Sequence, residues 1–382
     1  MHYEESAGLL TPMNQYNFSA GPGALPESVL DAAQAAIRAV PEVGLSVLGI
    51  SHRSDWFRQV VDEAEDNIRQ LLKLPKNYHV LFLQGGSSLQ FSMIPMTLLR
   101  GRQYPAEYLR TGYWSSKSIP EACREGRVNV LWDGEPQGFT RLPSDEELSF
   151  GKDASYFHYV SNETVEGLQF HRILGRDDVL RICDMSSDFL SRSIDVERFA
   201  LIYAHSQKNL GPAGVTVVIV RDDVLQLAPD DLHTVLDYRP HAATRSIYNT
   251  PPVFAIYVTL LVTRWLRNEI GGLAAMETMN SAKATLLYQT LDESAGFYRQ
   301  RAPVVDRSFM NVVFNLPTRE LEHRFLQITE RVGFSGLSGH RSIGGVRASL
   351  YNAVTVNAVE ALCSFMRDFQ RREDIQRRNG NG

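Results

Sequence analysis

Between residues 78 and 220 the sequence alternates short apolar runs with segments of helical pattern, and this alternation strongly restricts the folds open to the chain. Short continuous apolar runs are typical of strands that are buried on both faces of a sheet. Strands that alternate with helices favour a mainly parallel sheet with helices on both faces, an α/β fold. The runs are Tyr78–Leu83, Tyr108–Thr111, Val128–Trp132, Tyr156–Val160, Val179–Asp184, Phe199–Tyr203 and Val215–Val220.

The last two runs enclose a polar turn, Tyr203–Gly214, that carries a single lysine. Lys208 stands between Gln207 and Asn209, and a Gly-Pro pair follows. A flexible ammonium on such a turn, between two core strands, usually has a specific partner. One candidate partner is the aldehyde of pyridoxal phosphate, which attaches to a lysine.

Asp184 ends the preceding apolar run and is followed by Met-Ser-Ser. An acid at the carboxyl end of a strand reaches the crevice where α/β sheets bind ligands, and there it could pair with a protonated pyridine nitrogen. On these two residues alone, an alternative is equally open: Asp184 caps the next turn and Lys208 pairs with a surface acid.

A third motif follows the strand Tyr78–Leu83. Gln84–Ser88 reads Gln-Gly-Gly-Ser-Ser and leads into an apolar helical segment, Leu89–Leu99. Glycines let the backbone approach an anion, a helix N-terminus attracts it, and the hydroxyls of Ser87 and Ser88 add hydrogen bonds. The layout is that of a phosphate-binding turn, although similar turns without a ligand are common.

The order of these motifs, and the wording around them, resembles the phosphoserine aminotransferases among the fold-type-I pyridoxal-phosphate enzymes. The resemblance covers the chain from about Asn17 to Arg372 and is far more specific than any single motif. It rests on Asn17–Pro22, Leu25-Pro26, Ser51–Ser54, Ser161–Thr164, Asp184–Ser187, Gln207–Asn209, Tyr248–Pro252, Gly339–Arg341 and Arg347–Ala353.

The resemblance implies pyridoxal 5'-phosphate as the cofactor, no metal, and transfer of an amino group from L-glutamate to a phosphorylated keto acid. It assigns catalysis to Lys208 and Asp184. It assigns cofactor binding to these two and to Ser87, Ser88, Trp114, Thr164, Gln207, Asn249 and Thr250. It assigns substrate binding to His52, Arg53, His340, Arg341 and Arg347. Asn249 and Thr250 are expected to reach across a homodimer and complete the neighbour's site.

Length and composition fit a two-domain enzyme of this kind. At 382 residues the chain is too long for one small core. We expect a flexible arm over 1–16, a large cofactor-binding domain over 17–270, a smaller α+β domain over 271–372 and a frayed tail over 373–382.

The charge and the cysteines bear on partners and compartment. A net charge of −5 gives no electrostatic case for nucleic acid or an anionic membrane as the main partner. The chain has three cysteines without close spacing, which indicates no disulfide framework and favours a reducing cytoplasm. The apolar stretch Val253–Thr263 falls short of the ~20 residues that a membrane span requires.

The sequence also departs from the family's usual motifs at several positions. His205 and Ser206 stand where glycine and alanine are common, and Ser88-Leu89 stands where some members place an arginine. Three alternatives therefore remain: a paralogue for a related anionic amino acid, a lyase or sulfur-transfer enzyme on the same fold, and a non-catalytic binding protein. Formation of the phosphorylated threonine derivative of vitamin B6 synthesis is a further possible activity.

Overall fold

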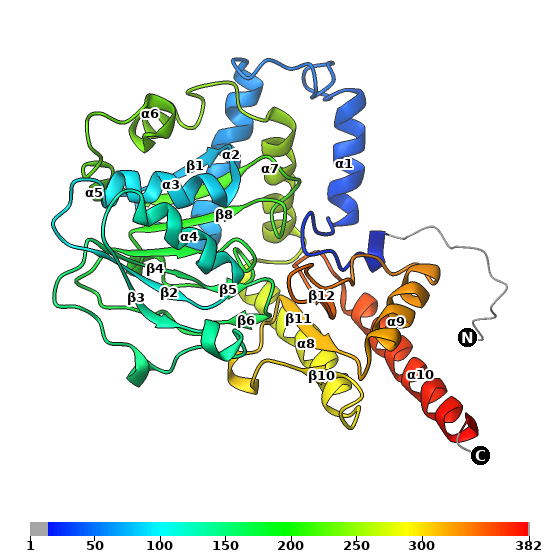
Figure 1. The fold of residues 1–382 in the computed structure, drawn as a ribbon. Helices are drawn as coiled ribbons and strands as arrows, with labels where there is room; N and C mark the ends of the chain where they lie inside the picture. Colours follow the sequence, from blue (N-terminus) through cyan, green and yellow to red (C-terminus); the bar gives the residue numbers. More distant parts are fainter. Residues whose placement is uncertain (1–13, 381–382) are drawn as a thin grey trace.

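The computed structural model describes residues 14–380, and its largest element is a seven-stranded sheet (Figure 1). The strand order is β1-β9-β8-β7-β4-β2-β3. All neighbours pair in parallel except β9, which is antiparallel to both β1 and β8. The predicted mainly parallel sheet is therefore confirmed. The strands are β1 (Tyr78–Leu83), β2 (Ala106–Arg110), β3 (Val128–Asp133), β4 (Tyr156–Val160), β7 (Arg181–Asp184), β8 (Leu201–His205) and β9 (Thr216–Arg221).

Helices cover both faces of this sheet, as β1 illustrates. Val80 and Phe82 pack with α1, α2 and α7, whereas Leu81 and Leu83 pack with α3 and α4 on the other face. Alternate residues of a strand point to opposite faces, so a strand buried on both sides must be apolar throughout. The helices are α1 (Glu27–Arg38), α2 (Asp55–Leu72), α3 (Gly86–Leu98), α4 (Tyr113–Cys123), α5 (Asp222–Leu225), α6 (Tyr238–Ala243) and α7 (Val253–Asn268).

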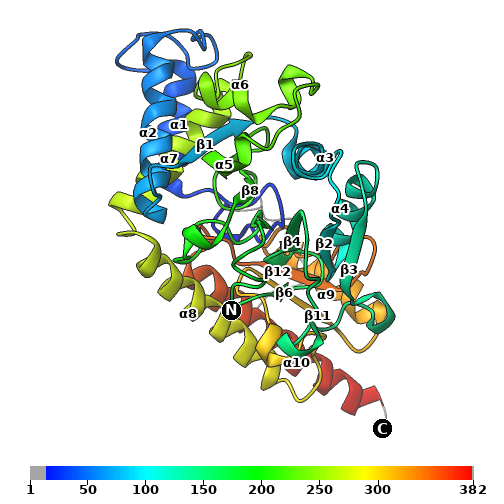
Figure 2. The same ribbon diagram turned by 90° about the vertical axis from the view of Figure 1, so that its left-hand side faces the viewer.

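The remaining elements form a second core. A three-stranded antiparallel sheet, β10-β11-β12, packs with three helices, and α8 and α10 lie side by side in both ribbon views (Figures 1 and 2). The buried ammonium of Lys283 ties α8 to the turn after β12 by donating to the carbonyls of Leu350, Tyr351 and Val354. These elements are α8 (Leu273–Asp292), β10 (Arg299–Gln300), β11 (Asn311–Asn315), α9 (Arg319–Arg331), β12 (Val346–Ser349) and α10 (Val356–Gly380).

Short elements complete the connections. A two-stranded hairpin, β5 (Asn162–Glu163) with β6 (Leu168–Gln169), follows β4 directly and carries Thr164 in its turn. The 3₁₀ helices are η1 (Asn14–Tyr16), η2 (Glu135–Gln137), η3 (Asp145–Glu147), η4 (Val196–Arg198), η5 (Thr234–Leu236) and η6 (Val304–Asp306).

The two ends of the chain were expected to be a flexible arm and a frayed tail. Residues 1–13 of the expected arm lie outside the described residues, and the ring of Tyr16 packs 5.0 Å from that of Phe334. The expectation of a frayed tail from residue 373 is wrong at its start, because α10 continues to Gly380. Glu373 is buried there and pairs with Arg324 of α9, which holds the extra turns in place.

Within residues 14–380, none of the helices combines the length and the apolar character needed to cross a bilayer.

Candidate active site

Lys208 lies in the loop that joins β8 to its antiparallel neighbour β9. Its side chain is 5% exposed, and its Nζ donates a hydrogen bond of 2.7 Å to Oγ1 of Thr164. Burial disfavours the ammonium and lowers the pKa of Lys208 to about 7, although nearby Asp184 opposes this shift. A large fraction of Lys208 is therefore an unprotonated amine near neutral pH.

Asp184 is the last residue of β7, the neighbour of β8 in the sheet. It is buried, and its Oδ1 accepts a hydrogen bond of 2.8 Å from the backbone N–H of Ser186. Burial raises the pKa of the Asp184 carboxyl to about 6, while Ser186 and Lys208 hold it down. Adjacent parallel strands thus deliver the acid and the lysine to the same edge of the sheet.

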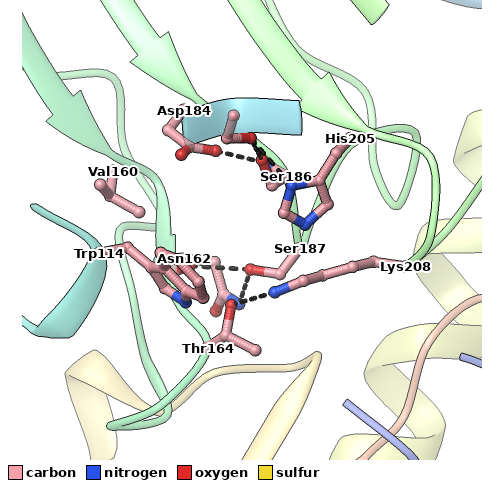
Figure 3. A pocket seen from close by; sticks show the side chains of 10 residues that line it. Trp114, Val160, Asn162, Thr164, Asp184, Ser186, Ser187, His205 and Lys208 are labelled. Atoms are coloured by element: carbon pink, nitrogen blue, oxygen red, sulfur yellow. Dashed lines mark hydrogen bonds between the residues drawn. The ribbon is translucent and has the colours of Figure 1, made fainter. Parts of the chain in front are cut away.

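These two residues line a common, narrow cavity (Figure 3). The indole of Trp114 forms one wall, with its ring centroid 5.8 Å from Nζ of Lys208. Two nitrogens of the wall, Nε1 of Trp114 and Nε2 of His205, are buried without a hydrogen-bond partner among the described residues. The lining residues are Ser87, Trp114, Val160, Asn162, Thr164, Asp184, Ser186, Ser187, His205 and Lys208.

The Gly-Gly-Ser-Ser turn adjoins this cavity at the start of α3. Gly85 caps the helix with φ of +90°, a conformation that favours glycine. The hydroxyl of Ser87 is buried and bonds to Oγ of Ser186 at 2.7 Å and to Nδ1 of His205 at 3.0 Å. Ser88 is exposed. The first turn of α3 therefore presents backbone N–H groups beside the cavity, as an anion-binding helix start requires.

Arg347 and His340 reach the same region from the second core. Arg347 of β12 is 9% exposed, and its Nη1 donates a hydrogen bond of 3.2 Å to the carbonyl of Thr164. The ring of His340 lies 4.8 Å from that of Tyr113, the residue next to Trp114. The neighbouring side chain of Arg341 is exposed. Arg347 and His340 are thus connected to the Lys208 cavity through Thr164, next to β5, and through Tyr113 of α4.

Four other predicted site residues lie away from the Lys208 cavity. His52 and Thr250 line a separate, open surface pocket together with Pro212 and Pro251. Arg53 and Asn249 are exposed. These residues are not among those that line the Lys208 cavity. Gln207, the remaining predicted residue, is partly exposed, and its side chain lies against Gly21.

Sequence reasoning gave no role to several residues of this region. Three of them follow the ends of β4 and β7 within motifs that the sequence analysis recognised: Asn162, Ser186 and Ser187. Their position at these strand ends could have identified them as site residues. His205 was noticed only as a departure from the family's wording. Glu163 and Glu166, which lie beside Thr164, were overlooked because nothing in the sequence indicates that two acids so close together are buried.

Comparisons with known proteins agree on one family. A family model described as aminotransferase class-V matches residues 15–362. A phosphoserine aminotransferase of Geobacillus kaustophilus is 49% identical over 94% of this chain and 98% of its own length. One from Laribacter hongkongensis is 49% identical over 94% and 99%.

Solved structures give the same result. A phosphoserine aminotransferase from Bacillus circulans subsp. alkalophilus is 46% identical, with a TM-score of 0.91 over 94% of this chain and 99% of that one. A "PLP bound" phosphoserine aminotransferase from Trichomonas vaginalis is 37% identical, with a TM-score of 0.87 over 92% and 99%. The predicted fold-type-I architecture is confirmed. The chain belongs to the class-V aminotransferases and, among them, to the phosphoserine aminotransferase family.

Proposed function

We propose that the chain transfers the amino group of L-glutamate to 3-phosphohydroxypyruvate, which yields O-phospho-L-serine and 2-oxoglutarate, with pyridoxal phosphate as its cofactor. Membership of the phosphoserine aminotransferase family supports this reaction. The structural observation that carries it is the buried amine of Lys208, which faces the Asp184 carboxyl across one cavity.

The residues present fit the cofactor. An aldehyde needs an unprotonated amine, and burial lowers the pKa of Lys208 enough to supply one at neutral pH. The unpartnered nitrogens of Trp114 and His205 show that the cavity wall offers hydrogen bonds to a polar ligand. A buried polar group left unpaired costs about 1–3 kcal/mol, so occupancy by such a ligand stabilises the site.

Each residue then has a defined task. Bound pyridoxal phosphate supplies an electron sink that makes the substrate's Cα–H bond acidic. Lys208 Nζ takes the Cα proton. Asp184 would keep a proton on the pyridine nitrogen, and the hydroxyl of Thr164 would hydrogen-bond to the phenolic oxygen of the cofactor. The ring of Trp114 covers one face of the cofactor. Ser87, Ser88 and Gln207 hold its phosphate.

Substrate binding is assigned to cationic and imidazole groups. Arg347 binds the α-carboxylate, since a guanidinium matches a carboxylate in a bidentate pair. His340 and Arg341 bind the distal anion, which is a phosphate in one half-reaction and a γ-carboxylate in the other. His52 and Arg53 complete that pocket from the neighbouring subunit of a cytoplasmic homodimer. Asn249 and Thr250 reach the neighbour's cofactor phosphate in the same way.

The test is a coupled assay of the purified protein with glutamate and 3-phosphohydroxypyruvate, followed by borohydride reduction and peptide mapping. We expect turnover, and a pyridoxyl label on Lys208. We expect Lys208→Ala to lose both, while an exposed lysine, Lys152→Ala, loses neither. A label on another residue would contradict the assignment of Lys208. Turnover only with a different anionic amino acid would identify a paralogue.

A further inference from the structure

Two buried carboxyl groups meet at the N-terminus of α4, outside the set of residues assigned so far. The carboxylate of Glu163 accepts hydrogen bonds of 3.1 Å from the backbone N–H groups of both Trp114 and Ser115. Oε1 of Glu166 accepts one of 3.0 Å from the N–H of Tyr113. The acids therefore satisfy the free N–H groups of the first helical turn, where negative charge is stabilised.

The two carboxyl groups are crowded together against Gly112. A Cβ on this glycine would lie 2.7 Å from Cδ of Glu163 and 2.5 Å from Oε2 of Glu166, so a larger residue would displace the carboxyl groups. Glu163 is fully buried and Glu166 is 6% exposed. Two like charges that are held this close, away from water, do not both ionise at neutral pH.

The surroundings decide which acid keeps the proton. Burial raises the pKa of both carboxyls, and the charge of Glu163 raises that of Glu166 further. Glu163 also accepts more hydrogen bonds, including one of 3.2 Å from the hydroxyl of Thr111. Oε2 of Glu166 has no partner among the described residues. Glu163 is therefore the anion, and Glu166 is the neutral acid.

The positive charge of Arg347 lowers the pKa of the Glu166 carboxyl, although burial outweighs this effect. Nη1 of Arg347 is bonded to the carbonyl of Thr164, the residue between the two acids, but Nε is buried without a partner among the described residues. An ionised Glu166 would attract this guanidinium and compete with any incoming carboxylate. A neutral Glu166 leaves the charge of Arg347 unopposed.

We propose that Glu163 and Glu166 form a positioning pair that shares one proton. Anionic Glu163 fixes the end of α4 that carries the Trp114 ring over the cavity. Neutral Glu166 keeps Arg347 available for the substrate's α-carboxylate. The second role rests on the proposed function, whereas the shared proton does not.

Infrared difference spectroscopy of the holoenzyme tests the shared proton directly. At neutral pH we expect the wild-type spectrum to contain the C=O band of a protonated carboxylic acid that Glu166→Gln lacks. Glu121→Gln, which removes a partly exposed acid from the same helix, should keep the band. Absence of a protonated-acid band from the wild-type minus Glu166→Gln difference would overturn the proposal, whether or not the chain is a transaminase.

A double-mutant comparison tests the effect on Arg347. In Glu163→Gln the charge that raises the pKa of Glu166 is gone, so Glu166 ionises more readily and attracts Arg347. We expect the dissociation constant of 2-methylalanine, followed by the absorbance of the bound cofactor, to rise about tenfold or more in this variant. Adding Glu166→Gln removes the competing charge and should restore binding.

The restored value should lie within about threefold of that of Glu166→Gln alone. If the substitutions only damaged packing, their effects on binding would add in the double variant. Failure of the double variant to regain binding would therefore overturn the role of Glu166 in substrate binding. Circular dichroism identifies a Glu163→Gln chain that does not fold, and the infrared experiment then decides. No binding of amino acids by the wild type would instead count against the proposed function.

Discussion

Lys208 and Asp184 are ionisable groups that folding removes from water, and each destabilises the chain until a ligand is bound. The folded pKa of Asp184 is near 6, above its usual 3.8, so the cost of its ionisation appears as the pH rises through 4 to 6. The folded pKa of Lys208 is near 7, below its usual 10.5. The loss of folding stability caused by its buried ammonium is complete below pH 7 and vanishes as the pH rises towards 10.5.

We therefore expect the double variant Lys208→Met/Asp184→Asn to stabilise the cofactor-free chain most strongly between pH 6 and 7, where both native residues are charged. The gain should be on the order of 8 kcal/mol, because the pKa values of the two groups differ from their usual values by about 2 and 3.5, and each unit corresponds to about 1.4 kcal/mol. It should decline towards pH 10 and towards pH 4. Urea unfolding across this pH range measures it. Lys152→Met, at an exposed position, is the control and should show no such profile.

How far sequence could identify site residues depends on how they reach the site. Asp184 stands at the end of a recognisable strand, so the rule that ligands bind at carboxyl ends of parallel strands located it, whereas Thr164 was assigned through the family resemblance. Glu163 and Glu166 escaped because acids are usually exposed, and their burial depends on the absence of a side chain at Gly112. His205 was visible as an unusual residue, but its bond to Ser87 joins elements 118 residues apart.

At the scale of the element, the first turn of α3 is shaped by two glycines that differ in their surroundings. Both have positive φ, +90° at Gly85 and +67° at Gly86. A Cβ at Gly85 would lie 2.6 Å from Cδ2 of Leu89, whereas one at Gly86 meets nothing within 4 Å. Alanine is disfavoured at both positions by the positive φ, but only at Gly85 would its Cβ also clash with a neighbouring side chain.

This difference makes a matched pair of variants. Gly86→Ala should cost about 1–2 kcal/mol of stability, the usual price of a left-handed alanine. Gly85→Ala should cost more, because the first turn of α3 must shift away from Leu89. We expect its affinity for pyridoxal phosphate to be at least about tenfold weaker than that of Gly86→Ala. Equal affinities, measured by reconstitution of the cofactor-free proteins, would show that this turn does not shape the phosphate site.

Two strands were predicted to the residue. Strands β1 and β4 begin and end at the residues that bound their apolar runs in the sequence. The end of α10 was misjudged because its last turns look polar and charged. The ion pair between Arg324 and Glu373, which holds them, joins residues 49 positions apart, and no local pattern reveals such a contact.

At the scale of the whole molecule, the predicted site residues fall into two groups on one chain. Lys208 and Asp184 line the cavity, and Arg347 bonds to the carbonyl of Thr164 beside it. His52 and Thr250 share an open pocket on the surface. In the proposed homodimer, the second group would enter the partner's site together, since an isologous interface presents the same patch from each subunit. Arg53 would then act on the substrate bound to the other chain.

Mixing two inactive variants tests this arrangement. Lys208→Ala and Arg53→Ala should each be nearly inactive with glutamate. A refolded equimolar mixture should recover about a quarter of the wild-type activity, because half of the dimers are mixed and each contains one intact site. A chain that carries both substitutions, mixed with itself, is the control. No recovery would place Arg53 and Lys208 in the same subunit's site.

The order of the strands also bears on how the chain acquires its site during synthesis. Asp184, Thr164, Trp114 and Lys208 all precede the end of β9 at Arg221, so the walls of the cavity can assemble once this part of the chain has been made. Arg347 meets Thr164 across 183 residues, and this contact must wait for β12. Because distant contacts close late, the nascent protein can form the Lys208 cavity before Arg347 reaches it.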